Sequence, residues 1–174
     1  GIAARHAEIR ASETEVAGLG LTLRGRADRI DIRDDGSADV LDYKTGASPS
    51  RRQAHTLLSP QLALEAALLQ RGAFADLGPA EPGELAYVRL KANGEVLQES
   101  ILKMKGSEKS APGLAAEAWE RLAQLLAHYH RADIGYRSRV LPFREGDMDG
   151  DYDHLARVLE WSAGGEAGEE GDGE

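Results

Sequence analysis

Apolar and polar residues alternate most regularly in two neighbouring runs of the chain, residues 21–33 and 38–45. Both runs are rich in β-branched and apolar residues, and a period of two residues is typical of a half-buried β-strand. The residues between them, Asp34-Asp35-Gly36-Ser37, are types that tight turns favour. The pattern therefore predicts a β-hairpin.

The register of this hairpin decides which side chains meet. We expect Arg33 to pair with Ser37 across a three-residue loop. Asp28 then lies directly opposite Asp42, with Cβ atoms roughly 5 Å apart, and Lys44 shares a face with Asp42. Two facing carboxylates repel unless a cation neutralises them, and Mg²⁺ commonly binds one or two carboxylates. The alternative is two solvated acids on an exposed hairpin, and a slip of one residue would separate them.

The rest of the pattern predicts an α/β domain. Ser59-Pro60 is a favourable helix start, and apolar residues then recur at helical spacing as far as Gly72. On this helix Gln61 and Glu65 are one turn apart and share a face. Asn93-Gly94 indicates a second hairpin. The further elements that we expect are a helix over 1–10, strands over 11–18, 84–92 and 95–103, a helix over 113–133 and a short helix over 153–162.

Composition narrows the class of protein. The 174 residues suit one domain with a sizeable core, and 41% hydrophobic with 29% charged residues is ordinary for a globular chain. No apolar run approaches the length of a membrane span, so we expect no membrane association. The chain has no cysteine, which excludes disulfides and cysteine-ligated zinc or iron–sulfur centres within it. Because it begins with Gly1 rather than methionine, we expect a fragment of a longer chain.

The net charge of −9 is unusual for a protein that binds nucleic acid. Five of the acids lie in residues 164–174, which hold no basic residue, so residues 1–163 carry a net charge of −4. Such a Gly/Glu-rich segment is typical of disorder. We therefore expect a folded domain over 1–163 and a disordered acidic tail over 164–174. An acidic domain of this kind needs a partner with basic surfaces in order to hold DNA strongly.

Four stretches together resemble a known enzyme family. They are GRADRID at 25–31, DYKTG at 42–46, SPQLALE at 59–65 and GDYDHLARVLEWS at 150–162. This pattern is similar to the PD-(D/E)XK nucleases of the RecB/AddB type, and most like the C-terminal nuclease domain of AddB proteins. The resemblance covers most of residues 10–163. It implies a restriction-endonuclease-like α/β core, with a central mixed sheet flanked by helices.

The resemblance also assigns chemical roles. Asp28 and Asp42 match the two acids that bind Mg²⁺, for which Mn²⁺ substitutes, and Lys44 matches the lysine that assists phosphodiester hydrolysis. The backbone carbonyl of Tyr43 is implied as a further metal ligand. The catalytic set implied is therefore Asp28, Asp42 and Lys44, and the implied metal ligands are Asp28, Asp42 and Tyr43.

Residues for DNA binding are predicted around this set. Gln61 matches the glutamine of the family's helix motif, whereas Glu65 stands where tyrosine is usual. Arg26 is expected on the first strand, and Arg51 and Arg52 in a loop after the second, where they can meet phosphate oxygens. The alternatives are charge balance for Arg26 and an ordinary exposed basic loop for the other two.

The resemblance implies a Mg²⁺-dependent DNA exonuclease domain. The enzyme would be part of a bacterial cytoplasmic helicase–nuclease complex with an AddA-type helicase subunit, processing DNA ends in recombinational repair of double-strand breaks. The alternative is a catalytically inactive nuclease-fold scaffold or DNA-binding subunit of the same kind of complex. The acidic charge, Glu65 in place of tyrosine and the lack of a suitable histidine upstream favour that alternative. An unrelated acidic binding module is a third interpretation, which leaves the convergence of the two acids and the lysine unexplained.

Overall fold

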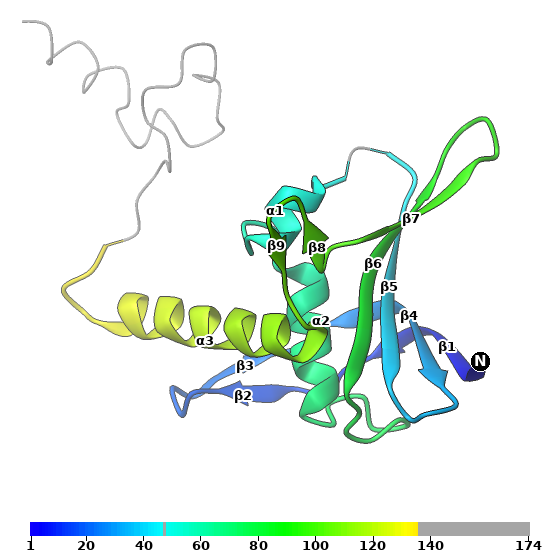
Figure 1. Cartoon of the computed structure of the whole chain (residues 1–174). Helices are drawn as coiled ribbons and strands as arrows, with labels where there is room; N and C mark the ends of the chain where they lie inside the picture. The colour runs from blue at the N-terminus through cyan, green and yellow to red at the C-terminus, as the bar shows by residue number, and fades with distance from the viewer. Residues whose placement is uncertain (47, 136–174) are drawn as a thin grey trace, which may run out of the picture. The chain divides into compact units, whose positions relative to one another are not determined.

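The computed structural model of the chain describes residues 1–46 and 48–135. Its centre is a five-stranded sheet in the order β1-β4-β5-β6-β7, in which only β5 and β6 run parallel (Figure 1). The sheet strands are β1 (Ile2–Arg10), β4 (Arg26–Arg33), β5 (Ala38–Lys44), β6 (Pro82–Leu90) and β7 (Val96–Ser100). Two small hairpins are formed by β2 (Thr14–Val16) with β3 (Leu21–Leu23) and by β8 (Lys103–Met104) with β9 (Ser107–Glu108). The helices are α1 (Arg51–His55), α2 (Gln61–Gln70) and α3 (Ala111–His130).

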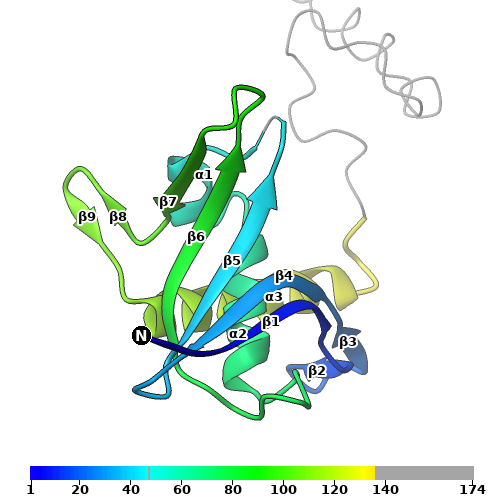
Figure 2. The ribbon, with the colours of Figure 1, turned by 90° about the vertical axis from the view of Figure 1, so that its right-hand side faces the viewer.

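All three helices lie on one face of the sheet (Figure 2). The parallel pair β5 and β6 is connected through α1 and α2, as a parallel pair requires a crossover. The core lies between this face and the helices, and its largest fully buried apolar side chains include Ile30, Val40, Leu62, Leu69, Leu85 and Leu114. This mixed sheet with flanking helices confirms the expected fold class.

The predicted hairpin of β4 and β5 has the register expected from its turn. Ile30 is paired with Val40, and the Arg33 amide donates a hydrogen bond of 2.8 Å to the Ser37 carbonyl. Gly36 has a φ of +83°, a conformation that glycine adopts without strain. The last pair of this ladder is Arg29 with Leu41. Asp28 and Asp42 are the next residues on the two strands, so both acids lie just beyond the end of the pairing.

The predicted helix over 1–10 is wrong, because these residues form β1. This strand pairs antiparallel with β4, and Ile9 lies opposite Ala27. The backbone donors and acceptors of β4 would otherwise form an open sheet edge, and pairing overrides the weak helical propensity of the segment. The expected single strand over 21–33 is also interrupted at Arg24-Gly25, where the small β2–β3 hairpin ends.

The second hairpin and the long helix occur where the pattern predicts them. β6 and β7 flank Asn93-Gly94, and α3 covers Ala111–His130. Only the first part of α3 is buried, since Leu114 and Ala118 are buried but Leu125 is 54% exposed.

The chain divides into two compact units, Gly1–His130 and Arg131–Glu174, and the sheet and helices above belong to the first. The predicted helix over 153–162 and tail over 164–174 lie outside the described residues. Within the described part of the chain, no helix combines the length and apolar character needed to cross a membrane.

Candidate active site

The candidate site lies where β4 and β5 stop pairing with each other. Asp28 is half-buried at this point, and its Oδ2 accepts a hydrogen bond of 2.9 Å from the Tyr43 backbone amide. The carboxylate thus satisfies a backbone donor that the ladder no longer pairs. The structure therefore brings Asp28 beside the Asp42-Tyr43-Lys44 segment, as the register predicts.

Asp42 is the most deeply buried acid of the site, with 1% of its surface exposed. Its Oδ2 lies 2.6 Å from Lys44 Nζ, and its Oδ1 accepts a hydrogen bond of 2.6 Å from Gln61 Nε2. Strand alternation sets Asp42 and Lys44 on the face that α2 covers. A buried carboxylate needs such charged or donating partners, because desolvation otherwise disfavours its charge.

Gln61 connects helix α2 to this strand. It is the first residue of α2, and its Nε2 also donates a 3.1 Å hydrogen bond to Glu65 Oε1. Its Oε1 faces Lys44 Nζ at 3.5 Å. The amide therefore presents its donor side to two carboxylates and its acceptor side to the ammonium group. Gln61 is itself exposed, so the network is reached from solvent.

Glu65 is a buried acid of the same network, with 6% of its surface exposed. Burial raises the pKa of its carboxyl to about 8, against the opposing effect of the Gln61 hydrogen bond. The negative charges of Asp42 and Asp28 contribute to this rise. The sequence placed Glu65 on the same helix face as Gln61, and the structure adds that it is buried and bonded to Gln61.

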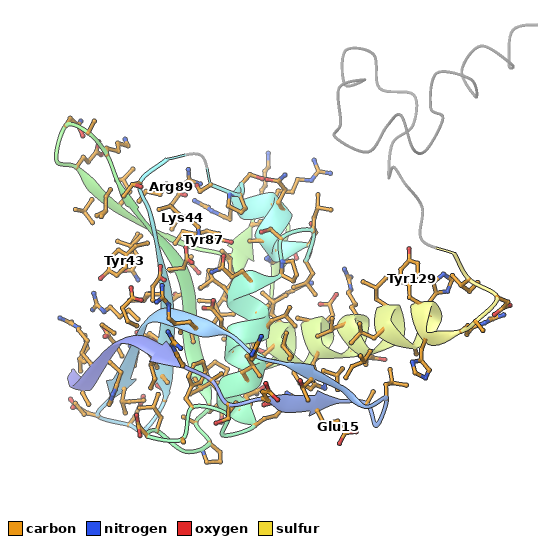
Figure 3. The ribbon with its side chains drawn as sticks, turned by 180° about the vertical axis from the view of Figure 1, so that it is seen from behind. Glu15, Tyr43, Lys44, Tyr87, Arg89 and Tyr129 are labelled. Carbon is orange, nitrogen blue, oxygen red and sulfur yellow. The ribbon has the colours of Figure 1, made fainter. Side chains whose placement is uncertain are left out.

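Tyr87 is a residue of the site that sequence reasoning missed. It lies on β6 beside Asp42 in the parallel register and has 1% of its surface exposed. Lys44 Nζ lies 5.8 Å from the centre of its ring, and burial raises the pKa of its hydroxyl. Figure 3 shows Lys44, Tyr87 and Arg89 gathered at this end of the sheet, whereas Glu15 lies on β2 away from them. The alternation of side chains along β6 indicates which face Tyr87 occupies. Only the parallel register of β6 with β5 shows that this position lies beside Asp42.

The charge of Lys44 is favoured by its surroundings. Partial burial disfavours the ammonium group, but the hydrogen bond and charge of Asp42 outweigh this effect and raise the pKa of Lys44. The lysine therefore remains a cation at neutral pH. A fixed cation beside two acids, at a solvent-accessible sheet end, is suited to binding and polarising an anionic group.

Sequence comparison assigns the family. A family model described as the PD-(D/E)XK nuclease superfamily matches residues 2–141. The chain belongs to this superfamily. Its members are generally nucleases, and they typically use divalent metal ions.

Similar proteins are much longer than this chain. An uncharacterised protein of Rickettsia bellii (strain RML369-C) is 32% identical over 114 residues, which are 57% of this chain and 14% of that protein. An uncharacterised protein of Rickettsia felis is 39% identical over 59 residues, 34% of this chain and 7% of that protein. The chain thus spans a small part of the length of these curated relatives. A solved structure titled "Crystal structure of SSO0001" matches with a TM-score of 0.38 and 21% identity, over 68% of this chain and 50% of that one.

The donor set fits the divalent ion that the superfamily typically uses. Asp28 and Asp42 offer hard carboxylate oxygens, which Mg²⁺ prefers, and the second oxygen of Glu65 is buried without a hydrogen bond. Among residues 1–46 and 48–135, however, no three acidic or histidine side chains already form a metal-holding group. Tyr43 meets Asp28 through its amide, so the expected role of its carbonyl stays a prediction.

Asp31 lies on the opposite face of β4 and belongs to a separate ion-pair cluster. Its carboxylate is 98% buried and accepts hydrogen bonds from Arg29 through Nε and Nη2, and from Arg5 Nε at 3.0 Å. Arg29 also donates a 2.9 Å hydrogen bond to the Tyr43 hydroxyl. Asp31 therefore has a structural role, since both of its partners are arginines of the sheet.

Arg26 lines a pocket at the start of β4. The pocket has a volume of about 560 Å³ and is lined by Arg10, Ala11, Ser12, Glu13, Arg24, Gly25 and Arg26. Arg26 is paired with Glu8 at 3.1 Å, and Arg24 lies 3.6 Å from Glu13. Arg26 is thus balanced by Glu8 of the neighbouring strand β1, and not by Asp28 or Asp31 of its own strand.

Arg51 and Arg52 are exposed on helix α1, so their predicted position in a loop is wrong. Ser50 and Gln53 form a capping box that starts this helix, and their spacing was the missed signal. His55 fixes α1, because its buried ring contacts the Ile101 carbonyl and the Ser107 hydroxyl at 2.8 Å. The two arginines are therefore carried by an anchored helix near the end of β5.

Proposed function

We propose that this domain hydrolyses phosphodiester bonds of DNA with the help of Mg²⁺ bound by Asp28 and Asp42. The observation that supports this best is the convergence of both acids with Lys44 at one solvent-accessible sheet end. Burial of Asp42 next to an ammonium group holds a charged pair where surface acids would be solvated. The family assignment makes nuclease chemistry the natural use of such a site.

Each residue has a distinct proposed part in the reaction. A divalent cation, when bound, supplies charge stabilisation to the phosphate and acidifies a bound water. Asp28 and Asp42 would hold that cation, with the Tyr43 carbonyl as a further ligand. Lys44 would orient the attacking water and stabilise negative charge that develops on the phosphoryl oxygens. Gln61 holds the Asp42 carboxylate in the metal-free protein and, being exposed, would also contact the DNA strand.

The wider biological setting is proposed on other grounds. The stretch 150–162 and the central motif resemble AddB proteins, so we propose an exonuclease domain that acts on DNA ends beside an AddA-type helicase in double-strand break repair. The net charge of −9 supports a partner that supplies basic surface for the DNA. The lengths of the relatives are consistent with a domain of a larger protein.

Degradation of linear single-stranded DNA in the presence of Mg²⁺ or Mn²⁺ tests the proposal. The wild-type chain is compared with Asp42→Asn and with Asp39→Asn, an isosteric control on the opposite face of the same strand. We expect metal-dependent cleavage that Asp42→Asn abolishes and Asp39→Asn retains. Equal cleavage by the wild type and Asp42→Asn contradicts the assignment. If none of the three proteins cleaves DNA, the assay is repeated on the longer parent chain with its helicase partner.

An inactive scaffold is the second candidate, and one observation favours it. Asp42 is already engaged within the chain, because its Oδ1 accepts a hydrogen bond from Gln61 and its Oδ2, which is buried, forms an ion pair with Lys44. The scaffold would be supported if the parent complex cleaves no DNA and this domain binds no Mn²⁺. Mn²⁺ binding that depends on Asp42 would support the nuclease.

A further inference from the structure

Glu65 carries a buried oxygen that the proposed reaction does not use. Its Oε1 accepts the Gln61 hydrogen bond at 3.1 Å, but its Oε2 makes no hydrogen bond to any residue that the structure describes. The residue is 94% buried, and a buried carboxyl oxygen without a donor destabilises the fold. An arrangement of this kind calls for an occupant that the protein alone does not supply.

The orientation of Glu65 identifies the chemistry of that occupant. One amide group, that of Gln61, bridges Glu65 and Asp42, so the two carboxylates face the same small region. Burial is the main cause of the raised pKa of Glu65, and the charges of Asp42 and Asp28 also raise it. Two carboxylates that share one amide donor, with the charge of Asp28 acting on Glu65 as well, are stabilised best by a hard divalent cation, which prefers carboxylate oxygens.

We propose that Glu65 contributes a third carboxylate to the metal site, next to Asp28 and Asp42. This inference rests on the proposed function and deepens it. Asp42 is at present engaged by Lys44 and Gln61, so a cation reaches the acids by displacing these two donors. The Gln61 side chain can be displaced because the residue is exposed at the start of α2.

A purely structural role for Glu65 predicts different behaviour. If Glu65 served only the fold, its replacement by the isosteric glutamine would change stability and leave metal affinity alone. If Glu65 instead binds the metal, its buried carboxyl group destabilises the metal-free protein. Glu65→Gln keeps an oxygen for the Gln61 hydrogen bond and removes a buried acid. Its metal-free stability is therefore expected to equal or exceed that of the wild type.

Mn²⁺ binding without DNA is the decisive measurement, by isothermal titration calorimetry and by electron paramagnetic resonance. The proteins compared are the wild type, Glu65→Gln, Asp42→Asn and the exposed control Glu15→Gln, with urea unfolding of each in the absence of metal. We expect Glu65→Gln to weaken Mn²⁺ binding about ten-fold or more and Glu15→Gln to leave it unchanged. Affinity of Glu65→Gln equal to that of the wild type overturns the inference.

The outcomes separate this inference from the proposed function. If Asp42→Asn loses both Mn²⁺ binding and cleavage while Glu65→Gln keeps wild-type affinity, only the inference fails. If the wild type binds no Mn²⁺, the metal site and the inference both fail. A measurement on the wild type covers the case in which Glu65→Gln does not fold. Protein with ¹³C in its glutamate carboxyl groups should show a hyperfine coupling to bound Mn²⁺, and its absence likewise overturns the inference.

Discussion

Gln61 of α2 donates a hydrogen bond of 2.6 Å to Asp42 of β5, and this contact joins the helix layer to the end of the sheet. The other oxygen of Asp42 lies 2.6 Å from Lys44 Nζ. The carboxylate is therefore held by one neutral donor and one cation, and a metal ion has to compete with both. This competition leads to opposite expectations for cleavage and for metal affinity when the lysine is removed.

Replacing Lys44 with methionine should separate metal binding from chemistry. Cleavage is expected to fall about 10²-fold or more, because a positive charge near the reacting phosphate is lost. Mn²⁺ affinity is expected to stay equal or increase, since the competing ammonium group no longer neutralises Asp42. Rates on single-stranded DNA and calorimetric titration with Mn²⁺ check both points. Lys91→Met, in the β6–β7 turn, is the control, and weaker Mn²⁺ binding by Lys44→Met alone would contradict the competition.

Gln61→Leu should destabilise the metal-free protein. The variant removes the donor that Asp42 Oδ1 and Glu65 Oε1 share, at a cost of about 1–3 kcal/mol in the free energy of unfolding. Added Mg²⁺ should recover part of this loss, because the cation replaces the missing partner. Urea unfolding with and without Mg²⁺ measures both effects, with Gln70→Leu at the other end of α2 as control. A loss that Mg²⁺ does not reduce would argue against metal binding at Asp42.

Arg51 and Arg52 should affect DNA binding rather than chemistry. Removal of one phosphate contact lowers the slope of log affinity against log salt by about 0.7 for single-stranded DNA. We expect Arg51→Ser and Arg52→Ser each to weaken binding in this way, with the maximal cleavage rate unchanged at saturating DNA. Lys105→Ser, in the exposed β8–β9 turn, removes the same charge elsewhere. An effect of the same size in Lys105→Ser would mean that only net charge matters.

Asp31 should stabilise the fold in a pH-dependent manner. The Arg29 hydrogen bonds lower the pKa of Asp31 despite its burial, and Arg5 adds to this effect. An acid whose pKa is lower in the folded state stabilises the protein above its ordinary pKa, and this contribution is lost as pH falls through the folded value. We therefore expect Asp31→Asn to lower the free energy of unfolding by about 1.5–3 kcal/mol at pH 7, with a smaller difference below about pH 4.

Denaturant unfolding of the wild type and Asp31→Asn between pH 7 and pH 3 provides this measurement. Asp76→Asn, which changes an exposed acid, should stay within about 0.5 kcal/mol of the wild type. A difference between Asp31→Asn and the wild type that grows as the pH falls would contradict the stated cause. Cleavage is expected to persist in Asp31→Asn, because this residue lies on the face of β4 opposite the site.

Local patterns were sufficient for the hairpin of β4 and β5. Its turn residues set the register, and the period of two set the face, so Asp28 and Asp42 could be brought together without knowledge of any other element. The same applies to Gln61 and Glu65, whose spacing on a helix makes them neighbours. Contacts of this kind depend on residues that are close in the sequence, where geometry leaves few choices.

Patterns failed where a partner distant in the sequence decides the conformation. Residues 1–10 have no strong periodicity, and only the unpaired edge of β4 makes them a strand. The end of β4 lies beyond the ladder with β5, so the hydrogen bond between Asp28 and the Tyr43 amide also depends on how the two strands separate. Secondary-structure propensity is a weak term compared with the free energy of pairing and burial.

The sequence by itself determined the hairpin, the helix motif and the family to which their residues belong. The tertiary structure alone decided that Tyr87 lies beside Asp42 and that Glu65 is buried with one oxygen free. The parallel register of β5 with β6 spans two helices, and the burial of Glu65 depends on how α2 packs against the sheet. Both features depend on how segments that are distant in the sequence pack against each other. Many close-packed side chains fix that arrangement together, so no single stretch of sequence determines it.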